Sequence, residues 1–156
     1  MDKTDIRILN LLRNDARIPN VALARELNMA PSAVLERVRK LEESGVIQGY
    51  VTRIDNRKLN KNMIVLIELD TDENIGDSSV GCKLAEFPEI LEILETCGER
   101  YYHLKVAVRN TDELADLMTR IGRIPLVRKS YSHLVLNTIK QDLSSEISEN
   151  AILKKG

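Results

Sequence analysis

The chain has 156 residues, 43% of them hydrophobic, and its formal net charge at pH 7 is −1. This length accommodates one large domain or two small ones, and no run approaches the ~20 apolar residues of a membrane span. The first residues lack the basic region and apolar core of a signal peptide, and the two cysteines, Cys82 and Cys97, form no CxxC motif. We therefore expect a cytoplasmic protein that does not associate with a membrane and holds no cofactor or metal.

The charge is unevenly distributed along the chain. Residues 1–58 contain 11 Lys and Arg against 8 Asp and Glu, whereas the remainder contains 12 against 16. A basic N-terminal part followed by an acidic C-terminal part is typical of a DNA-binding module joined to another domain. The imbalance is small, and an ordinary solvated surface would also produce it.

The first predicted helix runs from about Lys3 to Asn14. Asp2 is a candidate N-cap, and Asp5 adds negative charge to the first turn, where the helix dipole favours it. The apolar face of this helix is broad and contains Ile6, Ile8, Leu9, Leu11 and Leu12. We expect the helix to support its two successors rather than to contact DNA.

Residues 20–44 predict two helices joined by a tight turn. Asn20 can cap the first of them, and Asn28 tolerates the left-handed conformation in which helices often end. Pro31 suits the first position of the second helix. One apolar stripe at helical spacing follows, formed by Val34, Val38 and Leu41.

The end and the outer face of the second helix complete the motif. Gly45 is predicted to terminate it in a Schellman motif, with Val46 touching Leu41. The face opposite the stripe is small and largely basic, with Ser32, Ala33, Glu36, Arg37, Arg39 and Lys40. Two helices in this arrangement predict a helix-turn-helix that places the second helix in the major groove of DNA.

The next two segments lead out of this domain. Residues 46–54 are rich in β-formers and are expected to form a wing or a strand that leaves the domain. Tyr50 within them is expected to pack rather than to stack on DNA. Residues 55–61 are polar and without apolar period, so we interpret them as a hinge.

From Met63 the pattern changes to alternating strands and helices. The expected elements are a strand at 63–69 covered on both faces, a helix at 80–87 closed by Pro88, a strand at 90–97, a strand at 101–108, a helix at 112–123 capped by Thr111 or Asn110, and a strand at 131–139. The segment 90–97 is ambiguous, since its Glu spacing also suits a helix. As a strand it gives the ferredoxin-like order βαββαβ over residues 62–140, followed by a tail at 141–156.

The face of this sheet opposite the predicted core is unusually apolar. It is expected to carry Tyr101, His103, Ala107, Tyr131, His133, Val135 and Ile139. A solvated face should be mostly polar, so we infer that another subunit covers it. A register shifted by one residue would exchange the two faces.

These features together resemble the Lrp/AsnC (leucine-responsive, feast/famine) family of transcriptional regulators over nearly the whole chain. The matching residues are Asp2, Asp5, Ile8, Leu9, Leu12, Asp15, Ala16, Arg17, Leu23, Ala24, Pro31, Val34, Arg37, Val38, Leu41, Glu42, Gly45, Val46, Ile47 and Tyr50, then Pro88, Glu89, Ile90, Gly98, Tyr102, Leu104, Lys105, Val106, Pro125, Val127 and the VLNTIK run ending at Lys140.

The resemblance implies an α+β protein with two domains. They are a winged helix-turn-helix domain at residues 1–54 and a ferredoxin-like domain at residues 62–140 that binds an effector and forms the oligomer. It implies a homodimer, dimers of dimers up to an octamer, double-stranded DNA as partner and an amino-acid-like effector. The implied DNA-binding residues are Asn20, Pro31, Ser32, Ala33, Glu36, Arg37 and Lys40, and the implied effector-binding residues are Gly98, Glu99, Arg100, Tyr101 and Tyr102.

Four positions depart from the family pattern. Ala30 stands where Ser is usual, Glu36 where a basic residue is common, Tyr101 where the family has Asp, and Leu126 where it has Gly. The ammonium of a standard amino acid would pair with the missing carboxylate at position 101. We therefore rank no effector or a non-standard one first, an amino acid held by Glu99 second, and a metal at the histidines last.

Two other functions remain open at this point. Some proteins with this two-domain layout are tetrapyrrole decarboxylases, for which His103, His133 and Arg100 are the only candidate groups, and they form no convincing constellation. The chain could also be an orphan that only pairs with a paralogue through its sheet. His103 and His133 lack a third ligand at suitable spacing, so buried, hydrogen-bonded histidines are favoured over a metal pair.

Overall fold

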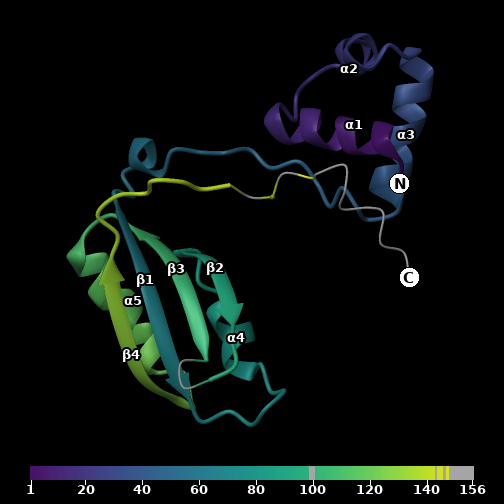
Figure 1. Ribbon diagram of the computed structural model, residues 1–156. Helices are drawn as coiled ribbons and strands as arrows, with labels where there is room; N and C mark the ends of the chain where they lie inside the picture. Colours follow the sequence, from purple (N-terminus) through teal and green to yellow (C-terminus); the bar gives the residue numbers. More distant parts are fainter. Residues whose placement is uncertain (99–100, 143, 146, 148–156) are drawn as a thin grey trace. The chain divides into compact units, whose positions relative to one another are not determined.

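The computed structural model describes residues 1–98, 101–142, 144–145 and 147. The chain divides into two compact units, and each is described by itself. One unit consists of Met1–Arg53 and the segment that starts at Lys140, and the other is Ile54–Ile139 (Figure 1). No helix in the described part of the chain is long and apolar enough to cross a membrane.

The first unit begins with helix α1, Lys3–Asn14, as predicted. Asp2 is its N-cap, and Asp2 and Asp5 form a capping box in which each side chain accepts the other's backbone N–H. The predicted cap at Asn20 is wrong, because Asn20 is the first residue of helix α2, Asn20–Leu27. The carbonyl of Pro19 already accepts from the backbone of Ala22 and Leu23, so the helix starts one residue earlier and its N-cap has no side-chain bond.

The turn after α2 follows the sequence prediction. Asn28 adopts a left-handed φ of 53° and ends the helix. Helix α3, Pro31–Glu43, then starts with Pro31, after an N-cap, Ala30, that makes no side-chain bond. The core of the unit consists of Ile8, Leu9, Leu23, Ala24, Leu27, Val34, Val38 and Leu41. The predicted stripe on α3 is therefore buried against α1 and α2.

The C-terminus of α3 differs in one detail from the predicted Schellman motif. Gly45 has the expected positive φ of 72°, and its N–H donates to the carbonyl of Glu42. The carbonyl of Leu41, however, accepts from Ile47 at 3.0 Å, and Ile47 packs against the core. Val46 is 47% exposed, and its contact with Leu41 stays a prediction.

Residues 46–54 form no strand, so the wing or exit strand expected there is absent. Extended, β-branched residues become a strand only where a neighbouring edge supplies backbone partners. Tyr50 instead bonds to α3, its hydroxyl donating to Oε1 of Glu42 at 2.9 Å. Partial burial and this carboxylate raise the pKa of Tyr50 to about 12. The expected hinge contains a short 3-10 helix, η1, Asn56–Leu59, capped by Asp55.

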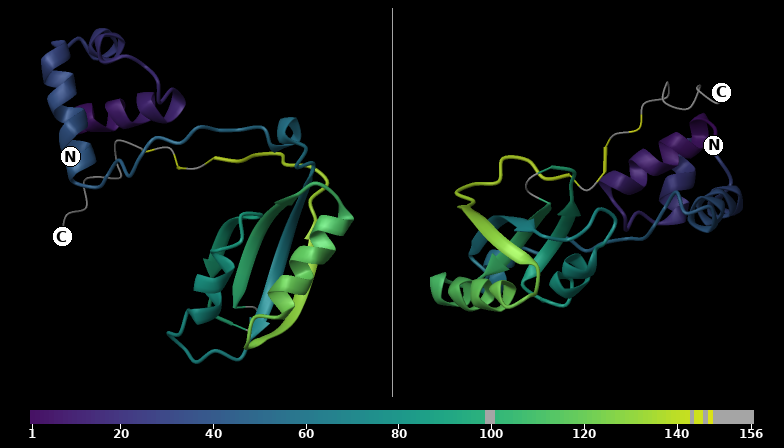
Figure 2. Two further views of the ribbon diagram at one scale, coloured as in Figure 1. Left: turned by 180° about the vertical axis from the view of Figure 1, so that it is seen from behind. Right: turned by 90° about the horizontal axis from the view of Figure 1, so that it is seen from below.

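The second unit is a four-stranded antiparallel sheet with two helices packed on one face (Figures 1 and 2). The strand order β2-β3-β1-β4 confirms the ferredoxin-like topology. The elements are β1 Met63–Thr71, α4 Ser79–Leu84, β2 Ile90–Glu95, β3 Tyr102–Val108, α5 Thr111–Gly122 and β4 Val127–Leu134. The ambiguous segment 90–97 is thus a strand, and α5 is capped by Asn110.

The limits of β4 and the end of α4 differ from the prediction, and strand pairing decides the limits of β4. Strand β4 begins at Val127 and ends at Leu134, since β1 pairs with it from Thr71 back to Val65. The last expected strand residues, 135–139, lie beyond that ladder. Helix α4 ends at Leu84, three residues before Phe87.

The connection into β4 contains an unusual backbone angle. Leu126 has a φ of +74°, in the left-handed region that a bulky side chain rarely adopts. This is the position at which the Lrp/AsnC pattern has Gly. The carbonyl of Leu126 accepts from the N–H of Asp72 at 2.9 Å, which fixes the connection to the end of β1.

Candidate functional site

The outer face of α3 presents most of the predicted DNA-binding residues. Pro31, Ser32, Ala33, Glu36 and Lys40 are all exposed there, whereas Asn20 at the start of α2 is half-buried. The buried stripe fixes the direction in which these side chains point. Their contact with DNA stays a prediction, and the structure gathers the α3 residues on one free surface.

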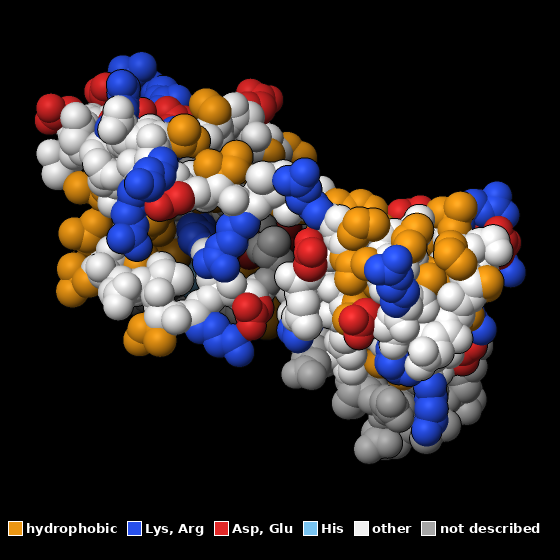
Figure 3. All heavy atoms as spheres, turned by 90° about the horizontal axis from the view of Figure 1, so that it is seen from above, with side chains coloured by type: hydrophobic (Ala, Val, Ile, Leu, Met, Phe, Trp, Pro, Cys, Tyr) orange, Lys and Arg blue, Asp and Glu red, His pale blue; other side chains and the backbone are white. Residues whose placement is uncertain are grey.

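The charges on this face are paired with one another. Oε1 of Glu36 lies 3.3 Å from Nη2 of Arg39 and 3.6 Å from Nζ of Lys40. Nη1 of Arg39 lies 3.5 Å from Oε1 of Glu43. The hydrogen bond from Arg39 lowers the pKa of Glu36, which therefore stays ionised. Figure 3 shows basic, acidic and hydrophobic side chains interspersed on one face of the molecule rather than a field of one sign.

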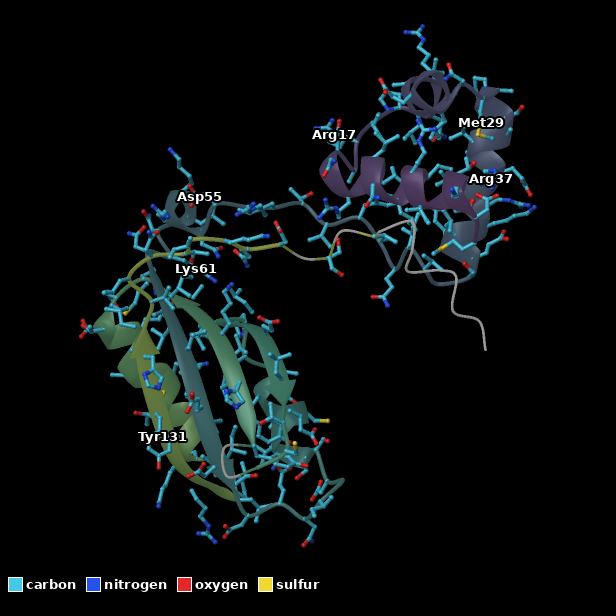
Figure 4. The ribbon with its side chains drawn as sticks, viewed as in Figure 1. Arg17, Met29, Arg37, Asp55, Lys61 and Tyr131 are labelled. Carbon is cyan, nitrogen blue, oxygen red and sulfur yellow. The ribbon has the colours of Figure 1, made fainter. Side chains whose placement is uncertain are left out.

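Arg37 differs from its neighbours on α3. Its Nη1 lies 2.7 Å from Oδ2 of Asp2 and 2.7 Å from Oδ1 of Asp5, so it is bound to the capping box of α1 (Figure 4). These hydrogen bonds raise the pKa of Arg37. The predicted DNA contact of Arg37 is untested, but its side chain already has two partners inside the unit.

The groove between α2 and α3 was missed by the sequence prediction. It has a volume of about 510 Å³ and is lined by Val21, Ala24, Arg25, Asn28, Met29 and Pro31. Arg25 is an exposed cation beside the turn. Its place on the polar side of α2 could have identified it, but the cations predicted to contact DNA all lie on α3.

The predicted effector-binding residues lie just before and at the start of β3. Gly98 has a φ of +129°, and Tyr101 and Tyr102 follow it, while the predicted contacts Glu99 and Arg100 lie outside the described residues. The hydroxyl of Tyr101 donates to Oε1 of Glu95 at 2.8 Å, and this carboxylate raises the pKa of Tyr101. The two tyrosine rings meet edge to face, 5.1 Å apart.

Two carboxylates missed by the sequence prediction stand in this region. Oε2 of Glu95 accepts from the hydroxyl of Ser78 at 2.8 Å, and the bonds from Ser78 and Tyr101 lower the pKa of Glu95. Oε1 of Glu73 accepts from the backbone of Val80 at 2.7 Å and from Ser79. Glu95 is six residues from Tyr101 and meets it across the paired strands β2 and β3, whereas Glu73 comes from the segment after β1, so the motif at residues 98–102 indicates neither acid.

Tyr102 is fully buried beneath α4. A Cβ at Gly81 would lie 2.9 Å from Cε1 of Tyr102, so only glycine fits at that point of the helix. The hydroxyl of Tyr102 is buried with no hydrogen-bond partner within the described part of the chain. Burial, with Glu73 nearby, raises the pKa of Tyr102.

The outer sheet face carries the predicted histidines. Glu68 of β1 lies opposite His103 of β3 and Tyr131 of β4, and Leu66 lies opposite His133, so the predicted shared face of these residues and Ala107 is confirmed. Tyr101, Val135 and Ile139 lie outside the assigned strands, although the N–H of Tyr101 donates to the carbonyl of Leu69 and that of Val135 to the carbonyl of Ile64.

This face is hollowed and partly apolar. A hollow of about 380 Å³ is lined by Leu66, Ile67, Glu68, Glu92, Leu94, Thr96, His103, Leu104, Lys105 and His133. Leu66 is 45% exposed, so within one chain β1 is covered on a single face. The side chain of His133 is 60% exposed, and its Nε2 lies 4.0 Å from Oε1 of Glu68. Among the described residues no group of three His, Cys, Asp or Glu side chains could hold a metal ion.

Comparison with known proteins accounts for both units. The family model described as winged helix-turn-helix DNA-binding matches residues 1–48, and the Lrp/AsnC ligand binding domain matches residues 62–144. The HTH-type transcriptional regulator FL11 of Pyrococcus horikoshii is 34% identical over 90% of this chain and 93% of its own. The chain belongs to the Lrp/AsnC family. It is a DNA-binding transcriptional regulator with a C-terminal ligand-binding domain.

Further relatives of this Lrp/AsnC protein agree in sequence and fold. The leucine-responsive regulatory protein of Escherichia coli K12 is 31% identical, over 90% of this chain and 88% of its own. A transcriptional regulator of Neisseria meningitidis, solved as a complex with L-Met, superposes with a TM-score of 0.88 over 98% of this chain and 99% of its own. Its 24% identity shows the shared fold alone.

Proposed function

We propose that this regulator acts in the cytoplasm as a homodimer that places one α3 helix of each chain in a major groove of double-stranded DNA. The single observation that supports this is the division of α3 into a buried stripe and a free face. Ser32 and Ala33 are small and lie near its N-terminus, where recognition helices approach base edges. Lys40 supplies an exposed cation for phosphate, and Glu36 can accept from cytosine N4.

The outer sheet face supports the homodimer. Leu66, Leu94 and Tyr131 leave apolar surface on a sheet whose other face is already covered by α4 and α5. Contiguous apolar surface of this kind is typical of a subunit interface. A second copy of the same face is the proposed cover, and such dimers would assemble further, as dimers of dimers up to an octamer.

The experiment that tests the DNA proposal is selection of bound fragments from genomic DNA with the purified full chain. The affinity for a selected fragment is then measured at several salt concentrations. Phosphate contacts release counterions, so log affinity should fall linearly with log salt. A dimer should protect two half-sites about one helical turn, ~10 bp, apart. A salt-independent affinity or a single protected half-site would contradict the proposal.

For the effector we propose a site at Gly98, Tyr101 and Tyr102, with Glu99 and Arg100 as further predicted contacts. The arrangement favours no response to the standard amino acids. Tyr101 stands in the place of a carboxylate, and it hydrogen-bonds the nearest acid, Glu95. An incoming ammonium would have to displace that hydroxyl from Glu95. A ligand with a hydrogen-bond acceptor could instead accept a hydrogen bond from the hydroxyl of Tyr101.

A further inference from the structure

We propose that Arg37 is a positioning residue, which holds the reading helix α3 against the start of α1 and acts on DNA binding through that contact rather than by touching DNA. The inference rests on the proposed function, in which the free face of α3 meets the major groove. Its basis is a closed network of three side chains, Arg37 on α3 with Asp2 and Asp5 at the start of α1.

The network engages all four carboxylate oxygens. Oδ1 of Asp2 accepts the N–H of Asp5 at 3.0 Å, and Oδ2 of Asp5 accepts the N–H of Asp2 at 2.7 Å. The two remaining oxygens both accept from Nη1 of Arg37 at 2.7 Å. The guanidinium therefore binds the two carboxylate oxygens that the capping box does not use, and it joins residues 32 and 35 positions apart in the chain.

Burial and charge keep Arg37 in this position. The side chain of Asp5 is 14% exposed and that of Arg37 is 33% exposed. If Arg37 swung out to a phosphate, two close carboxylates would lose their shared counter-charge, one of them with little access to water. Leaving a shielded charge unpaired is unfavourable. The N-terminal dipole of α1 would stabilise the two acids only in part.

The place of Arg37 on α3 agrees with this role. It lies next to Val38 and three residues after Val34, both buried, so its side chain leaves the helix at the border of the core. Lys40 by contrast is 69% exposed. The exposed residues proposed to meet DNA do not include Arg37. The orientation of the face that carries them depends on how α3 is held to α1.

The test uses the full chain, a selected genomic fragment and the variants Arg37→Ala, Asp5→Asn and the double variant. Asn at position 5 keeps a side-chain oxygen for the cap. We expect Arg37→Ala to weaken binding by about tenfold with an unchanged salt slope, since no phosphate contact is lost. Asp5→Asn should weaken binding to a similar extent, and the double variant should be no weaker than Arg37→Ala. Arg13→Ala, which removes an exposed arginine of α1, is the matched control.

Other outcomes would overturn the inference. A phosphate contact by Arg37 predicts that Arg37→Ala reduces the salt slope by about one. A base contact predicts that Asp5→Asn, by releasing Arg37, leaves affinity unchanged or improves it. If the wild-type chain shows no salt-dependent DNA binding, the proposed function fails on its own. Thermal unfolding of the wild type, Arg37→Ala, Asp5→Asn and the double variant then decides about Arg37, because additive losses at positions 37 and 5 would disprove the contact.

Discussion

The side-chain amide of Asn10 forms two hydrogen bonds with the backbone of Ile147. Its Nδ2 donates to the carbonyl of Ile147 at 3.0 Å, and its Oδ1 accepts the N–H of Ile147 at 3.3 Å. The side chain of Ile147 packs against the same core as α1, α2 and α3. The C-terminal segment is therefore part of the helix-turn-helix unit, although 137 positions separate the two residues.

This contact predicts a measurable loss of stability. Asn10→Ala should lower the free energy of unfolding by about 1 kcal/mol, the usual net contribution of such bonds. A chain that ends at Ile139 should lose at least as much, and adding Asn10→Ala to it should cost nothing further. Chemical denaturation of the full-length variant and of the truncated chain measures both losses. Asn14→Ala, an exposed asparagine of the same helix, is the control, and an equal loss there would contradict the assignment.

Stability should depend on pH through Asp2. The bond from the backbone of Asp5, followed by that from Arg37, lowers the pKa of Asp2 below its ordinary 3.8. A carboxyl whose pKa is lowered on folding contributes stability above its unfolded pKa and loses that contribution as pH falls through the folded pKa. Asp2→Asn should therefore reduce Tm at pH 7, and the difference from wild type should shrink below about pH 3.8. A constant difference across that range would refute the linkage.

The left-handed Leu126 predicts a stabilising substitution. A bulky residue at φ +74° carries strain of order 1–2 kcal/mol that glycine does not. We expect Leu126→Gly to raise Tm in spite of the greater flexibility of the unfolded chain. Leu126→Ala keeps the Cβ and should bring no such gain. Equal Tm values for the two variants would show that the backbone angle is not strained.

Tyr101 should control the response to amino acids. Thermal unfolding with each of the twenty at millimolar concentration should show no upward shift for the wild-type chain. A ligand at one hundred times its Kd would add about 2.7 kcal/mol, so binding would be evident. Tyr101→Phe removes the hydroxyl that bonds Glu95 and should permit a shift with at least one amino acid. A clear shift in the wild type would contradict our interpretation of the pocket.

Local patterns predicted most of the fold. The caps Asp2 and Asn110, the turn at Asn28 and the alternation in β3 depend on neighbouring residues, and the structure has them as expected. The expected wing failed because strand formation requires a partner edge, which a segment's own composition does not reveal. The predicted limits of β4 were wrong for the same reason, since the pairing of β4 with β1 sets them.

The candidate sites were predictable only where one element carries them. The free face of α3 follows from its buried stripe, but the partners of Arg37 lie on another helix. Likewise, Glu73 and Glu95 reach the region of Tyr101 through chain folding, and the sequence shows only that an aspartate is missing there. Contacts between distant segments depend on tertiary geometry, which periodicity does not encode.

The close approach of Gly81 to Tyr102 makes these two positions interdependent. A methyl group at position 81 would overlap the ring of Tyr102. A larger residue at position 81 therefore fits the present position of α4 only if position 102 carries a smaller side chain or its ring moves. Because α4 begins beside Ser78 and Ser79, a displaced helix would also move the hydroxyls that hold Glu95 and Glu73. A chimera that receives this region from a relative should therefore take the residues at positions 81 and 102 from the same protein. If only one of the two came from the relative, the side chain at position 81 could clash with the ring at position 102.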